Sequence, residues 1–236
     1  MARAMQAAGG LASTTACLAN NSRSQYQEDQ LLLPLLLQTS APRSFVELGA
    51  LDGERFSNTW LLEKCFGFNG LLIEANPSNF RALRSSRRNA TMRHSAVCDR
   101  DGGSVRVTTA GGATAGQTAL MSKRFIQTWG HRNAATTAVP CAPLRSLMAG
   151  AGLQHGATLL SLDVEGAEAL VLRTVDPAAF QVVLVEMDGQ TRAKDEKVHR
   201  LLTAAKLVHR ADLNAPNSRV YVQPELEGAF IFRPHI

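Results

Sequence analysis

From Ser44 onward, short apolar runs alternate with amphipathic stretches, and this alternation limits the possible folds more than any other feature of the chain. The apolar runs cover residues 44–48, 70–74, 92–97, 158–163 and 181–186. Helical patterns lie between them, at residues 57–66, 77–88, 165–173 and 195–207. Strands that alternate with helices in this way predict an α/β fold with a parallel sheet. The last apolar segments, residues 207–209 and 229–232, are expected to close the sheet edge as a hairpin-like pair.

The chain has 236 residues, a length that one doubly wound domain can hold. We expect one domain over residues 24–236, preceded by a mobile tail over residues 1–23. The tail contains no acid and is rich in small residues, which resembles an organellar targeting segment only weakly. We therefore expect a cytoplasmic protein. No membrane span is expected, because the longest aliphatic run, residues 31–37, is short and contains Pro34.

The formal net charge of +5 raises the question of a nucleic-acid partner. One dense basic stretch contains Arg81, Arg84, Arg87, Arg88 and Arg93. Its first members have helical spacing, and no aromatic side chain lies between them on which a base could stack. We interpret this stretch as a solvated helix face and expect no nucleic-acid partner.

The four cysteines are widely separated and form no Cys-x-x-Cys pair; they are Cys17, Cys65, Cys98 and Cys141. This spacing argues against a zinc site. The chain does not have the length of a small secreted disulfide framework, so reduced, buried thiols are expected.

Residues 110–133 break the alternation, being rich in Gly, Ala and Thr at first and then carrying Trp129 and His131. A long irregular segment in a compact domain usually serves a site or is disordered. Because this one lies between the third and fourth predicted parallel strands, we expect a lid or a substrate loop.

The first predicted strand-to-helix turn points to a ligand site. In an open α/β sheet, ligands bind beyond the carboxyl ends of the strands, and this turn contains Glu47, Gly49, Asp52 and Gly53. The glycines permit a tight turn and a close backbone approach, but their spacing is not that of dinucleotide folds. The acids oppose a diphosphate and suit a cofactor that carries sulfonium and ammonium groups. Glu74, at the end of the second predicted strand, has the position of a ribose-binding acid.

A third acidic group follows the fourth predicted strand, at Asp163, Glu165 and Glu168. One interpretation is structural, with Asp163 capping the next helix and the two glutamates favouring its positive end. The other places Asp163 at the cofactor or facing the acceptor, with Glu165 beside it. A metal site is a third alternative for these acids, but no bound metal is predicted.

These blocks, in this order, resemble the FkbM family of methyltransferases, which has the class I, Rossmann-like fold. The likeness runs from about Ser24 to Phe232 and is carried by residues 24–29, 45–53, 57–59, 71–77, 96–97 and, most specifically, 162–168. Leu51 departs from it, because the family often has a polar residue there. The resemblance implies a mostly parallel seven-stranded sheet with an antiparallel C-terminal edge.

The same resemblance implies S-adenosylmethionine as cofactor and O-methylation of a hydroxyl on a small molecule or a sugar. Its implied contacts are Glu47, Gly49 and Gly53 near the methionine side, Glu74 at the ribose, Ala96, Val97 and Cys98 along the adenine, and Asp163 at the reaction centre.

An alcohol acceptor needs a proton acceptor, a role worth roughly 10²–10⁴ in rate. The candidates are Asp163, His131, Glu186 and His94. The main alternative function is a catalytically silent interaction module of the same fold, because a fold does not fix activity. A nicotinamide dehydrogenase ranks below it, since the acids of the first turn disfavour a diphosphate.

Overall fold

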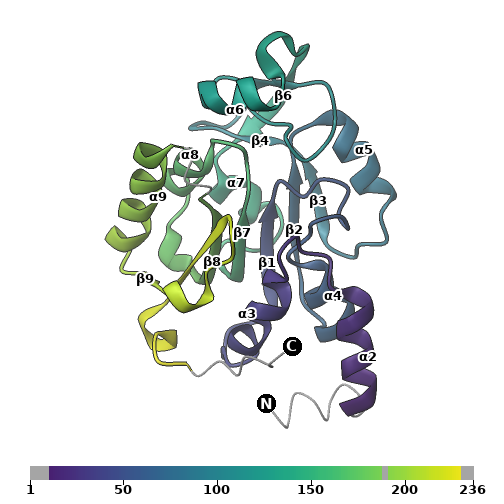
Figure 1. Cartoon of the computed structure of the whole chain (residues 1–236), viewed down its shortest axis with the longest axis vertical. Helices are drawn as coiled ribbons and strands as arrows, with labels where there is room; N and C mark the ends of the chain where they lie inside the picture. The colour runs from purple at the N-terminus through teal and green to yellow at the C-terminus, as the bar shows by residue number, and fades with distance from the viewer. Residues whose placement is uncertain (1–10, 188–190, 230–236) are drawn as a thin grey trace.

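The centre of the protein is a seven-stranded sheet in the order β3-β2-β1-β7-β8-β10-β9 (Figure 1). The computed structural model describes residues 11–187 and 191–229. The strands of this sheet are β1 (Ser44–Leu48), β2 (Asn69–Glu74), β3 (Thr91–His94), β7 (Ala157–Leu162), β8 (Phe180–Glu186), β9 (Val208–His209) and β10 (Ser218–Val222). The first five strands of that order pair in parallel, and β10 is antiparallel to both its neighbours. The predicted α/β fold class is confirmed.

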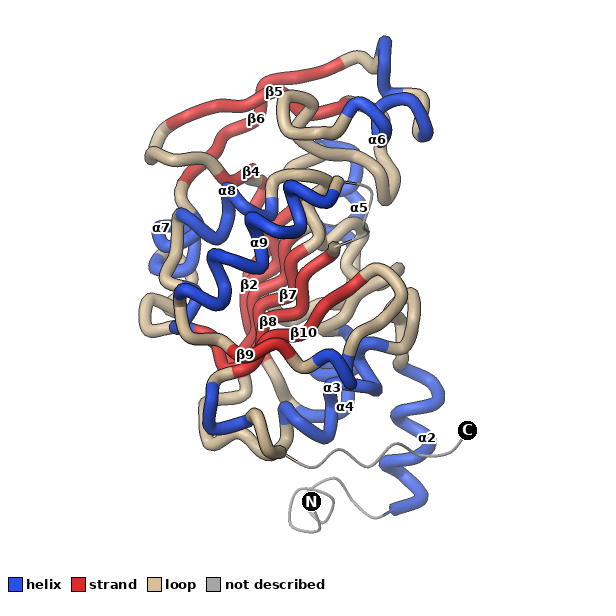
Figure 2. The backbone as a smooth tube through the Cα atoms, turned by 60° about the vertical axis from the view of Figure 1, so that its left-hand side comes forward, coloured by secondary structure: helices blue, strands red, loops and turns tan. Residues whose placement is uncertain are grey.

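Both faces of the sheet are covered by helices, as its strand sequences require (Figure 2). Successive side chains on a strand point to opposite faces, and in β1 Phe45 packs in one core cluster while Val46 packs in the other. One cluster contains residues of α7 (Leu144–Ala149), α8 (Glu168–Arg173) and α9 (Arg192–Ala204). The other contains residues of α3 (Glu28–Leu36), α4 (Trp60–Phe66) and α5 (Pro77–Ser85). Strands apolar on both sides therefore become central strands.

A second sheet lies beyond the carboxyl edge of the first, in the order β4-β6-β5 (Figure 1). It contains β4 (Ala96–Val97), β5 (Gly103–Thr108) and β6 (Thr136–Ala142). The strand predicted over residues 92–97 is thus two strands, because residues after Ser95 leave β2 and pair with β6 instead. The predicted insertion is the tip of the β5–β6 hairpin, and it includes α6 (Lys123–Thr128) and a 3-10 turn at His131–Asn133.

The C-terminal edge differs from the expectation in one strand. Residues 208–209 form β9 as predicted, but its partner is β10. The predicted strand over residues 229–232 lies mostly outside the described residues. β10 alternates between the two cores, with Val220 and Val222 in one and Tyr221 in the other. Three short 3-10 turns complete the chain, at Pro177–Ala179, Ala211–Leu213 and Pro224–Leu226.

The mobile tail predicted for residues 1–23 is wrong for residues 11–21, which form α2 (Leu11–Asn21) beside α4 (Figure 1). A disulfide joins Cys17 of this helix to Cys65 of α4, and a second joins Cys98 to Cys141. The expectation of reduced thiols is therefore wrong as well. The Cα atoms of the two pairs lie 6.0 and 5.6 Å apart, within the range for disulfides. Within residues 11–187 and 191–229, no helix has both the length and the apolar character to cross a bilayer.

Candidate active site

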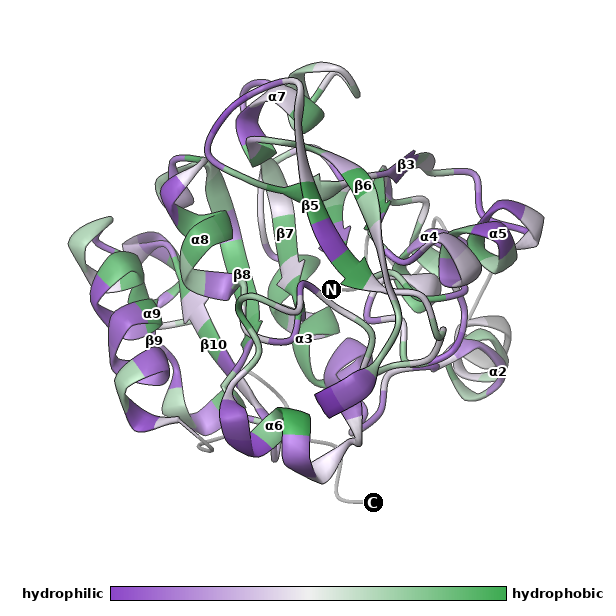
Figure 3. Ribbon diagram, turned by 90° about the horizontal axis from the view of Figure 1, so that it is seen from above, coloured by the Kyte–Doolittle hydropathy of each residue, from purple (hydrophilic) through white to green (hydrophobic). Residues whose placement is uncertain are grey.

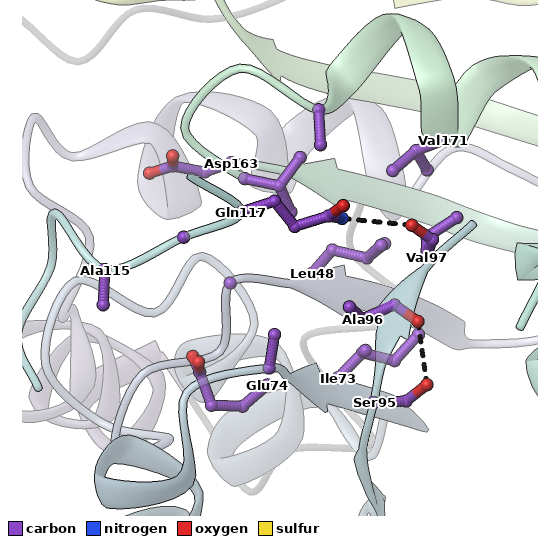
Figure 4. A pocket seen from close by; sticks show the side chains of 15 residues that line it. Leu48, Ile73, Glu74, Ser95, Ala96, Val97, Ala115, Gln117, Asp163 and Val171 are labelled. Atoms are coloured by element: carbon purple, nitrogen blue, oxygen red, sulfur yellow. Dashed lines mark hydrogen bonds between the residues drawn. The ribbon is translucent and has the colours of Figure 1, made fainter. Parts of the chain in front are cut away.

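An inner cleft opens where β1, β2 and β7 end. Its lining includes Leu48, Gly49, Ile73, Glu74, Ala96, Val97, Gln117, Asp163 and Val171. Figure 4 shows the carboxylates of Glu74 and Asp163 at one end of this cleft, and Ile73, Val97 and Val171 at the other. The cleft therefore has a polar end and an apolar end. Ala96 and Val97 line it as expected, whereas Cys98 is held in its disulfide.

Gln117, from the β5–β6 insertion, and Ser95, just before β4, brace the apolar end. Gln117 Nε2 donates to the carbonyl oxygen of Val97 at 3.0 Å, and Ser95 Oγ donates to that of Ala96 at 2.8 Å (Figure 4). Sequence reasoning identified neither residue, because their roles depend on β4 leaving the main sheet for β6.

Glu74 is a buried carboxylate with backbone donors on both oxygens. Leu51 N donates to Oε2 and Asn76 N to Oε1, at 2.8 and 2.7 Å. Burial nevertheless raises the pKa of Glu74 to about 7, against the lowering effect of these hydrogen bonds. Further hydroxyl donors in the cleft would stabilise its charged form. The polar end of the cleft therefore fits a diol such as that of a ribose.

Gly49 and Leu51 show why the first turn has its sequence. Gly49 has φ of +77°, and a Cβ there would lie 1.9 Å from the backbone oxygen of Asp163. The ends of β1 and β7 can therefore approach each other only with glycine at this position. Leu51 also has positive φ, 52°, and its N–H donates to Glu74.

Glu47 lines a passage beside the inner cleft, but its oxygens are already engaged. It accepts hydrogen bonds from Ser57 Oγ, Asn58 N and Thr59 Oγ1. Glu47 thus holds the loop before α4, and contact between this carboxylate and a cofactor stays a prediction. Residues 57–59, predicted from sequence as the start of a helix, form this loop instead, and Asn58 itself lines the passage.

Arg88 supports the same loop from behind, which corrects the interpretation of the basic stretch. Arg81, Arg84, Arg87 and Arg93 are exposed as expected, but Arg88 is only 7% exposed. Its guanidinium donates to Glu63 Oε2 at 2.8 Å, to Gly53 O at 2.6 Å and to Thr59 Oγ1 at 2.7 Å. The buried charge is therefore paired and hydrogen-bonded, as such charges must be.

The passage shares lining residues with the inner cleft and with an outer cavity of about 570 Å³. Six parts of the chain line this cavity: residues 25–28, 55–58, 112–129, the end of β7, the end of β8, and residues 217–218. Among the residues that the structure describes, Asp163 is the one that lines the cleft, the passage and the cavity.

Asp163 and Glu186 form a carboxyl pair at the junction. Burial, then the charge of Glu165, raises the pKa of Asp163 to about 7. Burial and the neighbouring Asp163 raise the pKa of Glu186 to about 10. At neutral pH Glu186 therefore keeps its proton and donates it in a hydrogen bond to Asp163, which titrates near neutrality. Asp163 lies deep in the protein, but its side chain is exposed because it faces the cavity.

The acids of the 163–168 segment divide between the two interpretations made from sequence. Glu168 is structural, because its Oε1 accepts from Val164 N and Gly166 N while its Oε2 lies 3.0 Å from Lys194 Nζ. Asp163 does not cap α8, whose N-cap is Ala167. Carboxylate oxygens of Asp163, Glu165 and Glu186 lie within 4.8 Å of one another and are of a type that Mg²⁺ accepts. The expected absence of a metal stays a prediction.

Besides Cys98, four predicted site residues do not line the cleft, the passage or the cavity. Asp52 Oδ1 accepts from the N–H groups of Glu54 and Arg55 and so stabilises its own turn. The Gly53 carbonyl is bound by Arg88. His131 stacks on Phe125 and lies 3.2 Å from Thr114 Oγ1, so the structure does not place it as the base. His94 stacks on Phe80. It ends β3, and β2 and β1 lie between β3 and β7, the strand that precedes Asp163.

Backbone strain gathers around this site. Five non-glycine residues of the described chain have positive φ, and three of them line the passage or the cavity: Leu51, Phe56 and Glu165. Gln27, a fourth, lies between two cavity residues, Tyr26 and Glu28. Such conformations cost roughly 1–3 kcal/mol each and concentrate at functional sites.

Comparison with known proteins agrees with this geometry. The model of the family described as "Methyltransferase FkbM domain" matches residues 47–209. No curated protein matches the chain.

Solved structures resemble the chain only distantly. A sugar N-methyltransferase, KedS8 from Streptoalloteichus sp., is 10% identical with a TM-score of 0.45, over 84% of this chain and 87% of that one. An O-methyltransferase from Bacillus cereus is 13% identical with a TM-score of 0.39, over 90% of each chain. A precorrin-6y C5,15-methyltransferase from Geobacter metallireducens is 11% identical with a TM-score of 0.39, over 81% and 85%. Likenesses this distant do not identify an activity.

Proposed function

We propose, from the premise that this chain belongs to the FkbM family of methyltransferases, that it methylates a hydroxyl oxygen of a small molecule or a sugar. Membership of the family makes S-adenosylmethionine the cofactor. When bound, this cofactor supplies a methyl group made electrophilic by the sulfonium. The remaining chemistry belongs to residues of the chain.

The position of Asp163 is the observation that carries this proposal. It is the described residue shared by the inner cleft, the passage and the outer cavity. A group at that junction can face both a cofactor in the cleft and an acceptor in the cavity. Alignment of two reactants is the main task in a displacement of this kind, and it contributes up to about 7–11 kcal/mol.

Each part of the site has a role in this proposal. Glu74 would hold the ribose hydroxyls, and Ile73, Ala96 and Val97 would contact the adenine. Asp163, with its pKa near 7, would take the proton of the acceptor hydroxyl as the new oxygen–carbon bond forms. Glu186 positions Asp163 by donating a hydrogen bond to it.

Transfer of a labelled methyl group tests the function. The protein is incubated with S-adenosylmethionine carrying a tritiated methyl group and with fractionated metabolite and glycan extracts. Label is expected in an alkali-stable methyl ether. Calorimetry with S-adenosylmethionine distinguishes the enzyme from the catalytically silent module. Cofactor binding without transfer of label to any fraction favours the interaction module. If no binding is detected, both the cofactor assignment and the site assignment are wrong.

The pH dependence of turnover is expected to move in opposite directions in two variants. Activity should fall below about pH 7, because protonated Asp163 cannot accept a proton. Glu165→Gln removes a charge that raises the pKa of Asp163, so the acidic limb should move to lower pH. Glu186→Leu removes a donor that stabilises the carboxylate, so the limb should move to higher pH.

Profiles of kcat/KM against pH measure these shifts, with the exposed Glu225→Gln as control. Identical limbs in all four proteins would show that Asp163 is not the titrating group.

Binding of S-adenosylmethionine is expected to release a proton near pH 7. Hydroxyl donors stabilise ionised Glu74 and lower its raised pKa, so affinity should be highest above pH 7 and weaken as the pH falls below it. Glu74→Gln should weaken binding by about tenfold or more, since bonds to a charged acceptor contribute about 1.5–3 kcal/mol. Calorimetry at pH 6 and pH 8 measures both effects. Asp52→Asn is the matched control, because Asp52 lies outside the cleft; a loss there equal to that of Glu74→Gln would contradict the assignment.

The two disulfides support an oxidising compartment instead of the expected cytoplasm. Disulfides persist in such compartments and are rare in the cytosol. Mass spectrometry of protein isolated from its source, with thiols blocked before lysis, should find both pairs intact. Four blocked thiols would contradict this placement.

A further inference from the structure

Two exposed aromatic side chains lie on the outer cavity. In the described part of the chain, three large hydrophobic side chains are exposed: Tyr26 at 39%, Leu120 at 37% and Trp129 at 53%. Tyr26 and Trp129 line the cavity, and Leu120 does not. Single exposed apolar residues are ordinary on protein surfaces, but two large rings on one cavity mark a binding surface.

Trp129 is supported by a stack of rings at the tip of the β5–β6 hairpin. Its ring centroid lies 6.4 Å from that of Phe125, which is buried. His131 stacks on Phe125 at 5.9 Å with an interplanar angle of 10°, and its Nε2 lies 3.2 Å from Thr114 Oγ1. His131 thus acts as a support for this surface. The segment expected as a lid or substrate loop is thus a hairpin tip that presents aromatic side chains to the cavity.

Tyr26 is fixed by a different part of the chain. Its backbone N–H donates to Glu28 Oε2 at 2.8 Å, and the next residue, Gln27, has φ of 63°. Its hydroxyl is 3.5 Å from Asn217 Nδ2. The strained turn therefore orients this ring at the cavity before any acceptor binds, which lowers the entropy lost on binding.

The charges around the cavity limit what can bind. Four carboxyl groups line it, those of Glu28, Asp163, Glu165 and Glu186, against one guanidinium, that of Arg55. Glu186 is neutral at neutral pH, but an anionic acceptor whose hydroxyl reached Asp163 would meet the negative charges of Asp163 and Glu165 at close range, which disfavours its binding. A volume of about 570 Å³ is within the range for drug-sized ligands.

We propose that Trp129 and Tyr26 form a stacking platform for the acceptor, and that the acceptor is an uncharged or cationic ring compound with a free hydroxyl. This deepens the proposed function and rests on it. The acceptor lays an apolar ring face on the platform while its hydroxyl reaches Asp163. A pyranose, with its C–H face, and a phenol both have this chemistry.

Intrinsic fluorescence tests the platform directly, because the chain has two tryptophans and the other, Trp60, is buried. The probes are methyl pyranosides, substituted phenols, open-chain erythritol, and the anionic glucose 6-phosphate. In the cofactor-loaded protein, ring probes should change the emission in a saturable way, and erythritol and glucose 6-phosphate should not. The change should vanish in Trp129→Phe. Saturation by pyranosides alone identifies a sugar acceptor, and by phenols alone a phenolic one.

Methylation of the same ring probes gives the second readout. Trp129→Ala should raise the acceptor KM about tenfold while leaving the cofactor Kd unchanged, and Trp129→Phe should restore most of the loss. Leu120→Ala is the matched control, an exposed apolar residue of the same hairpin tip that does not line the cavity.

Three outcomes would overturn the platform: no saturable signal with any ring probe, a signal that persists in Trp129→Phe, or a KM that Trp129→Ala leaves unchanged. Binding can also be followed in Asp163→Asn, where no chemistry is needed. A platform that binds ring probes in a protein that transfers no label would therefore overturn the proposed function and leave the platform standing.

Discussion

Asp163→Asn is expected to bind S-adenosylmethionine and to lose about 10²–10⁴ of kcat. Asparagine keeps the size of the side chain and can still accept a hydrogen bond, but it cannot take a proton. Cofactor binding should persist, because Glu74 and the apolar end of the cleft are unchanged. Calorimetry and single-turnover transfer of labelled methyl groups measure the two effects separately.

The exposed Asp99→Asn serves as the control for a lost carboxylate. Turnover of Asp163→Asn at the wild-type rate would remove Asp163 from the chemistry, leaving Glu186 as the remaining predicted base on the cavity. Loss of cofactor binding together with turnover would instead make Asp163 a binding residue. The expected result therefore needs both measurements.

Arg88→Met is expected to lower the free energy of unfolding by about 3–5 kcal/mol. Removing the guanidinium takes away the partner of Glu63 Oε2, leaves this buried carboxylate with Lys64 on its other oxygen, and removes the donors to Gly53 and Thr59. Because these residues belong to the loops around the site, cofactor affinity should also fall in the fraction that still folds. Urea denaturation measures the first effect and calorimetry the second.

A double variant separates the lost pair from general damage. Glu63→Gln combined with Arg88→Met should be more stable than the sum of the two single losses predicts, since both charges are then absent. Arg84→Met, on an exposed position of α5, should change stability by no more than about 0.5 kcal/mol. A loss in Arg88→Met as small as that of Arg84→Met would show that the buried network contributes little.

Much of the fold and part of the site were predictable from local sequence. The five predicted parallel strands lie within two residues of their observed starts, apart from the division at Ser95. Gly49, Glu74 and Asp163 were found because the carboxyl ends of parallel strands meet at one edge of a sheet, so a residue's place on its strand predicts its place in space.

The remaining site residues have no comparable local signal. Asn58 falls at the start of a predicted helix, and Arg88 falls in a stretch interpreted as a solvated basic helix face. Trp129 and Tyr26 reach the same cavity from distant segments, neither of which belongs to the main sheet. A short window of sequence contains no information about contacts between such distant segments.

Local sequence is sufficient to predict the strand and helix order and the acids at the sheet edge, because periodicity and turn chemistry act over a few residues. Only the folded chain shows which acids face the cavity and which are held in ion pairs, as Asp163 and Glu168 illustrate. It also decided the cysteine pairs, which join residues 48 and 43 positions apart. The physical reason is that burial, pairing and pKa depend on neighbours brought together by the whole chain.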